Sequence, residues 1–459
     1  MALPAKVSYH QSLGPPIMTH LRNYPWLGIS IFIIIIINIA ILFLAIPALS
    51  DRLHSSYNQD GYADCYDQLA ANLVAGNGYR VYPETAKTMI REPGYPLLLA
   101  GLFLLFGQNI TAVKVANLVL AFAAALLMTR IARRVSSSRV LLLGPSLLFL
   151  LHPGTLIAES RGGVEIAFAF LLVLFMLTVY RAIDSNSALD YMVSGAVLGL
   201  AILVKGTPIL FPFFLFIYIL IVDRRAPAST ICRNVVLLVA VMFAVLSPWI
   251  IRNYLLTGRF VPTADVLGIS AHAGLYDNTH VADNGNWAII DREGARERTR
   301  LAQEQGFILK NNKNGYYQDF YSSNDELEFS RYLFREVMSE YQNRPLLFIE
   351  CVRNNLFNFW FRGKNSAATT MNIILQLPFL FLAIVGVALS IRNTCFRLVA
   401  PLVLFIIYIV AVHAVVLAQA RYSVPMIPFM SILGCIPLAA VQERVSRRER
   451  DVVSGVHAA

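Results

Sequence analysis

A long apolar run near the start of the chain limits the folds that this sequence can adopt. Residues 29–49 include five consecutive isoleucines and no charged residue. A helix of about 20 apolar residues spans the roughly 30 Å hydrocarbon core of a bilayer. The run is too long, and lies too far along the chain, for a cleavable signal peptide. With 57% hydrophobic and only 14% charged residues among 459, the sequence predicts an all-α polytopic membrane protein.

Similar apolar segments recur along the chain and predict about ten transmembrane helices. Basic residues cluster in the short loops between them, so the net charge of +10 indicates topology and not a nucleic-acid partner. With those loops in the cytoplasm, both termini are cytoplasmic. The run 95–106 is too short to cross and is expected at the outer membrane face. The predicted spans are 27–49, 112–130, 139–158, 163–181, 188–204, 207–222, 233–251, 368–391, 398–418 and 423–441.

This predicted topology divides the chain into four regions. Residues 1–251 form a transmembrane catalytic module that includes a first external loop at 50–111, with interfacial helices. Residues 252–367 form an external, periplasmic region, here named the polar region, whose later part has apolar residues at helical intervals. Residues 368–441 form the C-terminal membrane helices, and 442–459 a cytoplasmic tail. Cys65 and Cys351 would both lie outside the cytoplasm, so a pairing is open, although single buried thiols are favoured.

The first external loop carries three aspartates, Asp60, Asp64 and Asp67, at intervals of four and three residues. On a helix such a spacing places all three on one face. Crowded carboxylates repel each other, which raises the pKa of at least one of them and favours a base. The alternative is a solvated polar face with no chemical role.

Several cations lie at the outer face of the membrane in this predicted topology. They are Arg91 beside a proline turn, Lys205 between two spans, Arg252 at the end of a span, and Arg421. Each could simply interact with lipid headgroups, as arginines and lysines at span ends do. Together with the aspartates they favour a site for an anionic head group, since arginine binds phosphate through two hydrogen bonds.

Four short motifs resemble landmarks of the polyprenyl-phosphate-dependent glycosyltransferases, the relatives of protein O-mannosyltransferases and of the aminoarabinose transferase that modifies lipid A. Residues 64–79 read Asp-x-Tyr-x-x-Leu-Ala-x-Asn-Leu-x-x-Gly-x-Gly-Tyr, and residues 91–96 read Arg-x-Pro-x-Tyr-Pro. Residues 248–253 (Pro-Trp-x-x-Arg-Asn) and 421–428 (Arg-Tyr-x-x-Pro-x-x-Pro) are similar to later landmarks of bacterial members.

The resemblance implies a C-type glycosyltransferase fold and a sugar donor carried on a polyprenyl phosphate. It implies that Asp64 is the general base, with Asp60 as its competitor for that role. It places Arg91 at the donor phosphate, and the predicted topology adds Arg252 or Lys205 as a second cation there. The remaining site candidates are Asp67, Tyr66, Tyr95, Glu165 and Arg421.

The expected function is transfer of a sugar to a glycan, lipid or protein acceptor at the outer face of the cytoplasmic membrane. The sequence contains no nucleotide-binding or histidine metal motif, implies no fixed cofactor, and leaves a need for a divalent metal open. One alternative is a transporter or flippase for lipid-linked sugars, although repeated halves are not evident. Another is a polymerase or ligase for lipid-linked glycans.

Overall fold

The computed structural model describes residues 25–46, 63–136, 138–223, 226–280, 287–310 and 319–456. The chain divides into two compact units, residues 1–58 and 59–459. The first unit contains helix α2 (Pro25–Ala40) and the π-helical turn η1 (Ile41–Ala45), where the first span was predicted. Asp60 lies outside the described residues, so its predicted role stays a prediction.

Six helices of the second unit are long and apolar enough to cross a membrane, by the described residues alone. A seventh span would be the pair α7 (Arg139–Leu150) and α8 (Pro153–Ser160), which bends by 48°. The polytopic helical class is therefore confirmed, but the count of ten is not. The six are α6 (Ile110–Ala132), α9 (Val164–Ser185), α12 (Ala228–Thr257), α17 (Ser366–Arg392), α18 (Phe396–Val415), and the 3-10 turn η7 (Ala420–Met426) with α19 (Ile427–Val456).

The other predicted spans form shorter apolar helices. They are α10 (Ala188–Val204) and a segment built from η4 (Thr207–Leu210), α11 (Phe211–Tyr218) and η5 (Ile219–Asp223). The bend between α7 and α8 has a local cause, because Pro153 begins a new helix and the His152 ring accepts a hydrogen bond from the Gly154 amide at 3.0 Å.

Glycines allow the membrane helices to pack closely. A Cβ atom on Gly195 of α10 would lie 2.1 Å from the Leu238 carbonyl oxygen of α12. A Cβ atom on Gly386 of α17 would lie 2.0 Å from the Leu433 carbonyl oxygen of α19. Small residues at such crossings are the usual way for membrane helices to approach each other.

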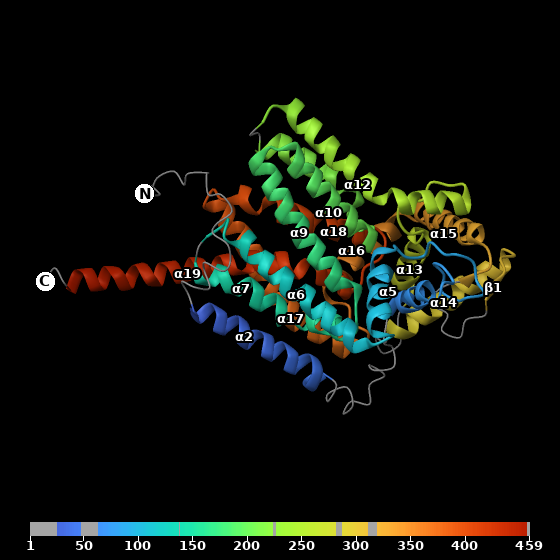
Figure 1. The fold of residues 1–459 in the computed structure, drawn as a ribbon, viewed down its shortest axis with the longest axis horizontal. Helices are drawn as coiled ribbons and strands as arrows, with labels where there is room; N and C mark the ends of the chain where they lie inside the picture. Colours follow the sequence, from blue (N-terminus) through green and yellow to red (C-terminus); the bar gives the residue numbers. More distant parts are fainter. Residues whose placement is uncertain are drawn as a thin grey trace. The chain divides into compact units, whose positions relative to one another are not determined.

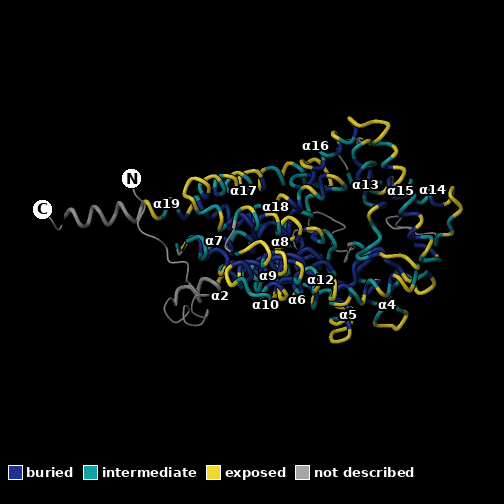
Figure 2. Tube along the Cα trace, turned by 90° about the horizontal axis from the view of Figure 1, so that it is seen from above, coloured by how far each residue is buried: buried dark blue, intermediate teal, exposed yellow. Residues whose placement is uncertain are grey.

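The polar region is mostly helical, as predicted, and lies at one end of the membrane helices of the second unit (Figure 1). It contains α13 (Leu267–Thr279), α14 (Trp287–Glu304), α15 (Ser323–Asn343) and α16 (Pro345–Phe361). The strands β1 (Leu309–Lys310) and β2 (Asp319–Phe320) pair antiparallel. The tube in Figure 2 shows buried stretches on each of the labelled helices α13 and α15, as expected for helices with one apolar face.

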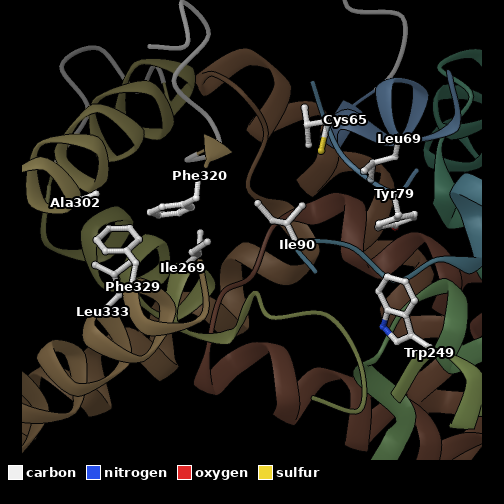
Figure 3. Packing of buried hydrophobic residues seen from close by; sticks show 11 residues of the cluster. Cys65, Leu69, Tyr79, Ile90, Trp249, Ile269, Ala302, Phe320, Phe329 and Leu333 are labelled. Atoms are coloured by element: carbon white, nitrogen blue, oxygen red, sulfur yellow. The ribbon is translucent and has the colours of Figure 1, made fainter. Parts of the chain in front are cut away.

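The loop between the first two predicted spans, residues 50–111, contains α4 (Tyr66–Val74) and α5 (Gly94–Phe106). The 13-residue helix α5 is about 20 Å long, which agrees with the prediction that this run is too short to cross. Residues from this loop and from the polar region form one hydrophobic core (Figure 3). Leu69 of α4 and Phe329 of α15 are both fully buried in it.

The predicted helical stripe of aspartates is wrong for Asp64 and Asp67. Asp64 (φ 74°, ψ 26°) and Cys65 (φ 58°) both have left-handed backbones, and helix α4 begins only at Tyr66. Asp64 therefore lies in a tight turn and shares no helix face with Asp67. All five cysteines are free, and Cys65, Cys351 and Cys435 are buried, in line with the preference for single thiols.

Candidate functional site

The Asp64 carboxylate is held by two arginines that are far apart in the sequence. Arg421 of η7 donates from Nη1 to Oδ2 at 2.8 Å and from Nη2 to Oδ1 at 3.3 Å. Arg91 lies with Nη2 at 3.4 Å from Oδ1 and donates from Nε to the Asp64 main-chain oxygen at 3.3 Å. Two guanidinium groups on one carboxylate strongly favour its ionised form. The structure thus brings together three predicted site residues from the loop and the last membrane segment.

Hydrogen bonds to the neighbouring backbone fix the segment that carries Arg91. The Tyr79 hydroxyl donates to the main-chain oxygens of Arg91 and Glu92, each at 3.0 Å. The Glu326 carboxylate of α15 accepts from the Thr88 hydroxyl at 2.6 Å and from the Met89 amide at 2.7 Å. A rigid loop of this kind keeps a functional side chain in place at little entropic cost during binding.

Lys205 lies in the turn between α10 and η4, close to the same cluster. Its ammonium group is 4.1 Å from the centre of the Tyr422 ring, and the Arg421 guanidinium is 5.3 Å from that ring. The turn is fixed by the Gly206 amide, which donates to Glu92 at 2.8 Å. Burial lowers the pKa of Lys205 to about 8, against the opposing effect of the Glu165 carboxylate. Lys205 is therefore charged at neutral pH but close to losing its proton.

The other predicted candidates line the surroundings of this cluster. Tyr66 is buried beneath Arg91, with the guanidinium 5.8 Å from the ring centre, and meets Tyr95 edge to face at 5.3 Å. The Tyr95 hydroxyl donates to the Gly162 carbonyl at 2.5 Å, so Tyr95 connects α5 to the turn before α9. Glu165 is buried in the first turn of α9, where the helix dipole stabilises a carboxylate.

Two predicted residues have a different environment. Arg252 donates to the main-chain oxygen of Thr88 at 2.9 Å and lies over the ring of Trp249 at 4.5 Å. It therefore supports the loop backbone. Asp67 is half-buried in the first turn of α4, and burial raises the pKa of its carboxyl group.

The polar region contains a second set of charged residues that the sequence did not reveal. Arg362 lies 3.0 Å from Asp277 and 3.7 Å from Asp291, and its guanidinium is 3.9 Å from the Trp287 ring. Burial raises the pKa of Asp291, against the opposing effects of the Arg362 and Arg421 charges. These residues belong to no local motif, and their separation along the chain conceals the cluster. Glu92 and Glu326, which fix the loop, were also missed.

The cluster formed by Asp64, Arg91, Arg421 and Lys205 is suited to binding a phosphate. Its cations come from three separate segments of the chain, namely the turn before α5, the turn after α10, and η7. The part of the chain that the structure describes has no group of three or more histidine, cysteine or acidic side chains placed to hold a metal ion. Asp64, at 17% side-chain exposure, and Arg421, at 36%, are accessible enough to meet a ligand. A carboxylate beside several cations can accept a proton while those cations stabilise a phosphate.

Comparison with known proteins gives a family match and a shared fold. Residues 91–251 match the family of dolichyl-phosphate-mannose-protein mannosyltransferases. A comparison with curated protein sequences gave no match. Among solved structures, the chain resembles the oligosaccharyltransferase AglB from Archaeoglobus fulgidus, in complex with an inhibitory peptide and a dolichol-phosphate, with a TM-score of 0.50 and 14% identity over 84% of this chain. It spans 47% of the length of that protein.

A weaker similarity is to ArnT from Cupriavidus metallidurans bound to undecaprenyl phosphate. The identity is 14% and the TM-score 0.36, over 82% of this chain and 72% of that one. The likeness to AglB confirms the predicted C-type glycosyltransferase fold. The chain is thus a multi-pass membrane protein with that fold, and the family match covers the part that contains Arg91, Glu165 and Lys205.

Proposed function

We propose that this protein is a membrane glycosyltransferase that moves a sugar from a polyprenyl-phosphate donor to an acceptor hydroxyl or amine. The observation that carries the proposal is the Asp64 carboxylate held between Arg91 and Arg421 beside Lys205. The family match and the shared fold support the donor class, because the compared AglB structure contains a dolichol-phosphate. The site is proposed at the outer face of the cytoplasmic membrane, with both termini in the cytoplasm.

In the proposed reaction the acceptor oxygen or nitrogen attacks the anomeric carbon, and the bond from that carbon to the phosphate oxygen breaks. Asp64 takes the acceptor proton, and polyprenyl phosphate leaves with the bonding electrons. A single displacement of this kind inverts the anomeric configuration. Arg91 and Lys205 stabilise the leaving phosphate, an electrostatic contribution worth about 3 kcal/mol for one donor in comparable sites. Arg252 is not assigned to the phosphate, because its guanidinium supports the loop.

A carboxylate paired with two arginines is a weak base. The donor phosphate competes for the same guanidinium groups, so donor binding weakens their hold on Asp64 and makes the carboxylate more basic. The proposal therefore includes an order: the donor binds first and prepares the base for the acceptor. The polar region, at 252–367, is proposed to shape acceptor choice, since it shares a core with the loop that carries Asp64.

The test uses purified protein in nanodiscs with a panel of radiolabelled polyprenyl-phosphate sugars. We expect release of polyprenyl phosphate with at least one donor, and a fall of about 10² to 10⁴-fold in Asp64→Asn. Asparagine tolerates the left-handed backbone of residue 64, so this variant removes the charge and keeps the turn. Asp67→Asn is the matched control and should retain activity.

Other outcomes distinguish the alternatives. Movement of the intact donor across the bilayer without cleavage would identify a flippase and contradict the proposal. Loss of activity in Asp60→Asn with full activity in Asp64→Asn would reassign the base to Asp60. Thiol labelling of a cysteine introduced at position 67 from the cytoplasmic side would place the site on the wrong face.

A further inference from the structure

A basic pocket of about 400 Å³ lies near the point where α12 ends, apart from the Asp64 site. Arg259 follows the end of α12 at Thr257 by two residues. Arg331 and Arg335 reach the pocket from α15, where a separation of four residues places them on the same side of the helix. Three guanidinium groups from two parts of the chain therefore line one small space.

The ion pairs at this pocket leave much of its positive charge uncompensated. Glu328 is shared between Arg259 at 3.8 Å and Arg331 at 3.6 Å, which are long contacts between exposed side chains. Exposed pairs of this kind contribute little. In the described part of the chain Arg335 forms no ion pair. One exposed carboxylate therefore faces three arginines.

The second acidic group of the pocket does not neutralise the remaining positive charge of the arginines. Asp265 also lines it, and burial raises the pKa of its carboxyl group to about 7. Burial therefore favours the neutral form of this carboxyl group. With three arginines around it, the pocket is suited to an anion.

Apolar side chains around the pocket indicate which anion it meets. Leu267, at the start of α13, and Phe334 line the pocket, and Leu267 is 52% exposed. Leu255 in the last turn of α12 is 78% exposed and Phe260 is 66% exposed, and they lie four residues before and one residue after Arg259 in the sequence. Such side chains beside arginines at the end of a membrane helix are typical of the interface between hydrocarbon and headgroups. A soluble anion would gain nothing from them, whereas a lipid places its phosphate among cations and its chains against apolar residues.

We propose that this pocket binds the phosphate of an anionic phospholipid from the surrounding membrane. Arg331 and Arg335 hold the phosphate, Arg259 closes the site from the end of α12, and the acyl chains lie along Leu255 and Phe260. The proposal does not depend on the glycosyltransferase function. The chemistry recognised is a phosphate, which a lipid headgroup or a free phosphate ion could supply, and the experiment separates the two.

The experiment measures lipid retention on the full-length protein by native mass spectrometry from detergent. Phosphatidylglycerol is the anionic probe and phosphatidylcholine the zwitterionic one. The test variant is Arg331→Gln with Arg335→Gln, and the control is Arg344→Gln with Arg353→Gln, which removes two exposed arginines elsewhere in the polar region. We expect the test variant to weaken phosphatidylglycerol binding roughly tenfold to thirtyfold, and the control by less than about twofold.

Loss of lipid binding can be distinguished from loss of folding, because exposed arginines are not needed for folding. Thermal unfolding of both variants should match the wild type, which shows that any lost binding reflects the pocket. Equal retention of the two lipids by the wild type, or equal losses in test and control variants, would overturn the proposal. Displacement of phosphatidylglycerol by inorganic phosphate at equal concentration would assign the pocket to a soluble anion instead.

Discussion

The ion pair between Asp64 and Arg421 can be tested by a double-mutant cycle with Asp64→Asn and Arg421→Gln. Two unit charges about 4 Å apart attract by about 4 kcal/mol at an effective dielectric constant of about 20. The side chains are 17% and 36% exposed, so solvent screening reduces this value. We therefore expect a coupling free energy of about 1.5 to 2 kcal/mol, above the range of surface pairs and below that of fully buried ones.

The measurement is the free energy of unfolding in mixed micelles, followed by circular dichroism as the denaturing detergent is increased. The coupling of Asp64 with Arg91 should be smaller, at about 1 kcal/mol, since that carboxylate contact is a single one at 3.4 Å. Arg252→Gln serves as the control, because its guanidinium interacts with Thr88 and Trp249, and its effect should add to that of Asp64→Asn within about 0.5 kcal/mol. A coupling for Arg421 no larger than that for Arg252 would refute the arrangement of charges described here.

Two further predictions concern stability. Burial raises the pKa of Glu326 from 4.5 to about 7, so the contribution of the protonated side chain to stability is complete below pH 4.5 and is lost as pH rises through 7. Relative to Glu326→Gln, the wild type should lose on the order of 3 kcal/mol of unfolding free energy between pH 4.5 and 8. Equal pH profiles of the two proteins would contradict this. Gly268→Ala should lower the free energy of unfolding by several kcal/mol, because its Cβ would lie 1.7 Å from the Ser330 main-chain oxygen. Gly101→Ala, with no atom within 4 Å, should be neutral or stabilising in the same unfolding measurement.

The helical membrane class could be predicted because hydrocarbon imposes a simple rule on composition. The long apolar segments form helices, and so does the shorter apolar run at α5. The number of complete spans could not be predicted in the same way. Hydropathy locates apolar segments but does not show where a helix breaks, as it does at Pro153, or that α10 has only 17 residues.

The site was only partly predictable for a similar reason. Asp64, Arg91 and Arg421 stand in motifs that resemble a known family, and a consistent topology placed them on one face. The left-handed turn at Asp64 was hidden, since helical spacing of aspartates predicts a stripe. Glu326 bonds to Thr88, which is 238 residues away, and no local pattern reports such a contact.

The balance of charge at the site predicts which step its cations favour. The phosphate of a polyprenyl-linked sugar is a diester with one negative charge, whereas the leaving polyprenyl phosphate is a monoester that approaches two. In the proposed transfer, Arg91, Lys205 and Arg421 therefore interact more strongly with the phosphate as the bond breaks than with the bound donor. Interactions that strengthen in this way raise the rate of the chemical step more than the affinity.

Lys205 provides the sharpest test of this argument, because burial lowers its pKa to about 8. Lys205→Met should lower kcat for the proposed transfer about 10² to 10³-fold, the range for loss of one electrostatic donor, and change the donor KM much less. Wild-type turnover should fall as pH rises through 8, when the ammonium loses its proton. In Lys205→Arg that alkaline decline should move to higher pH, since a guanidinium stays charged. An unchanged decline in Lys205→Arg would mean that another group controls it, and an effect on KM alone would show that Lys205 only binds the donor.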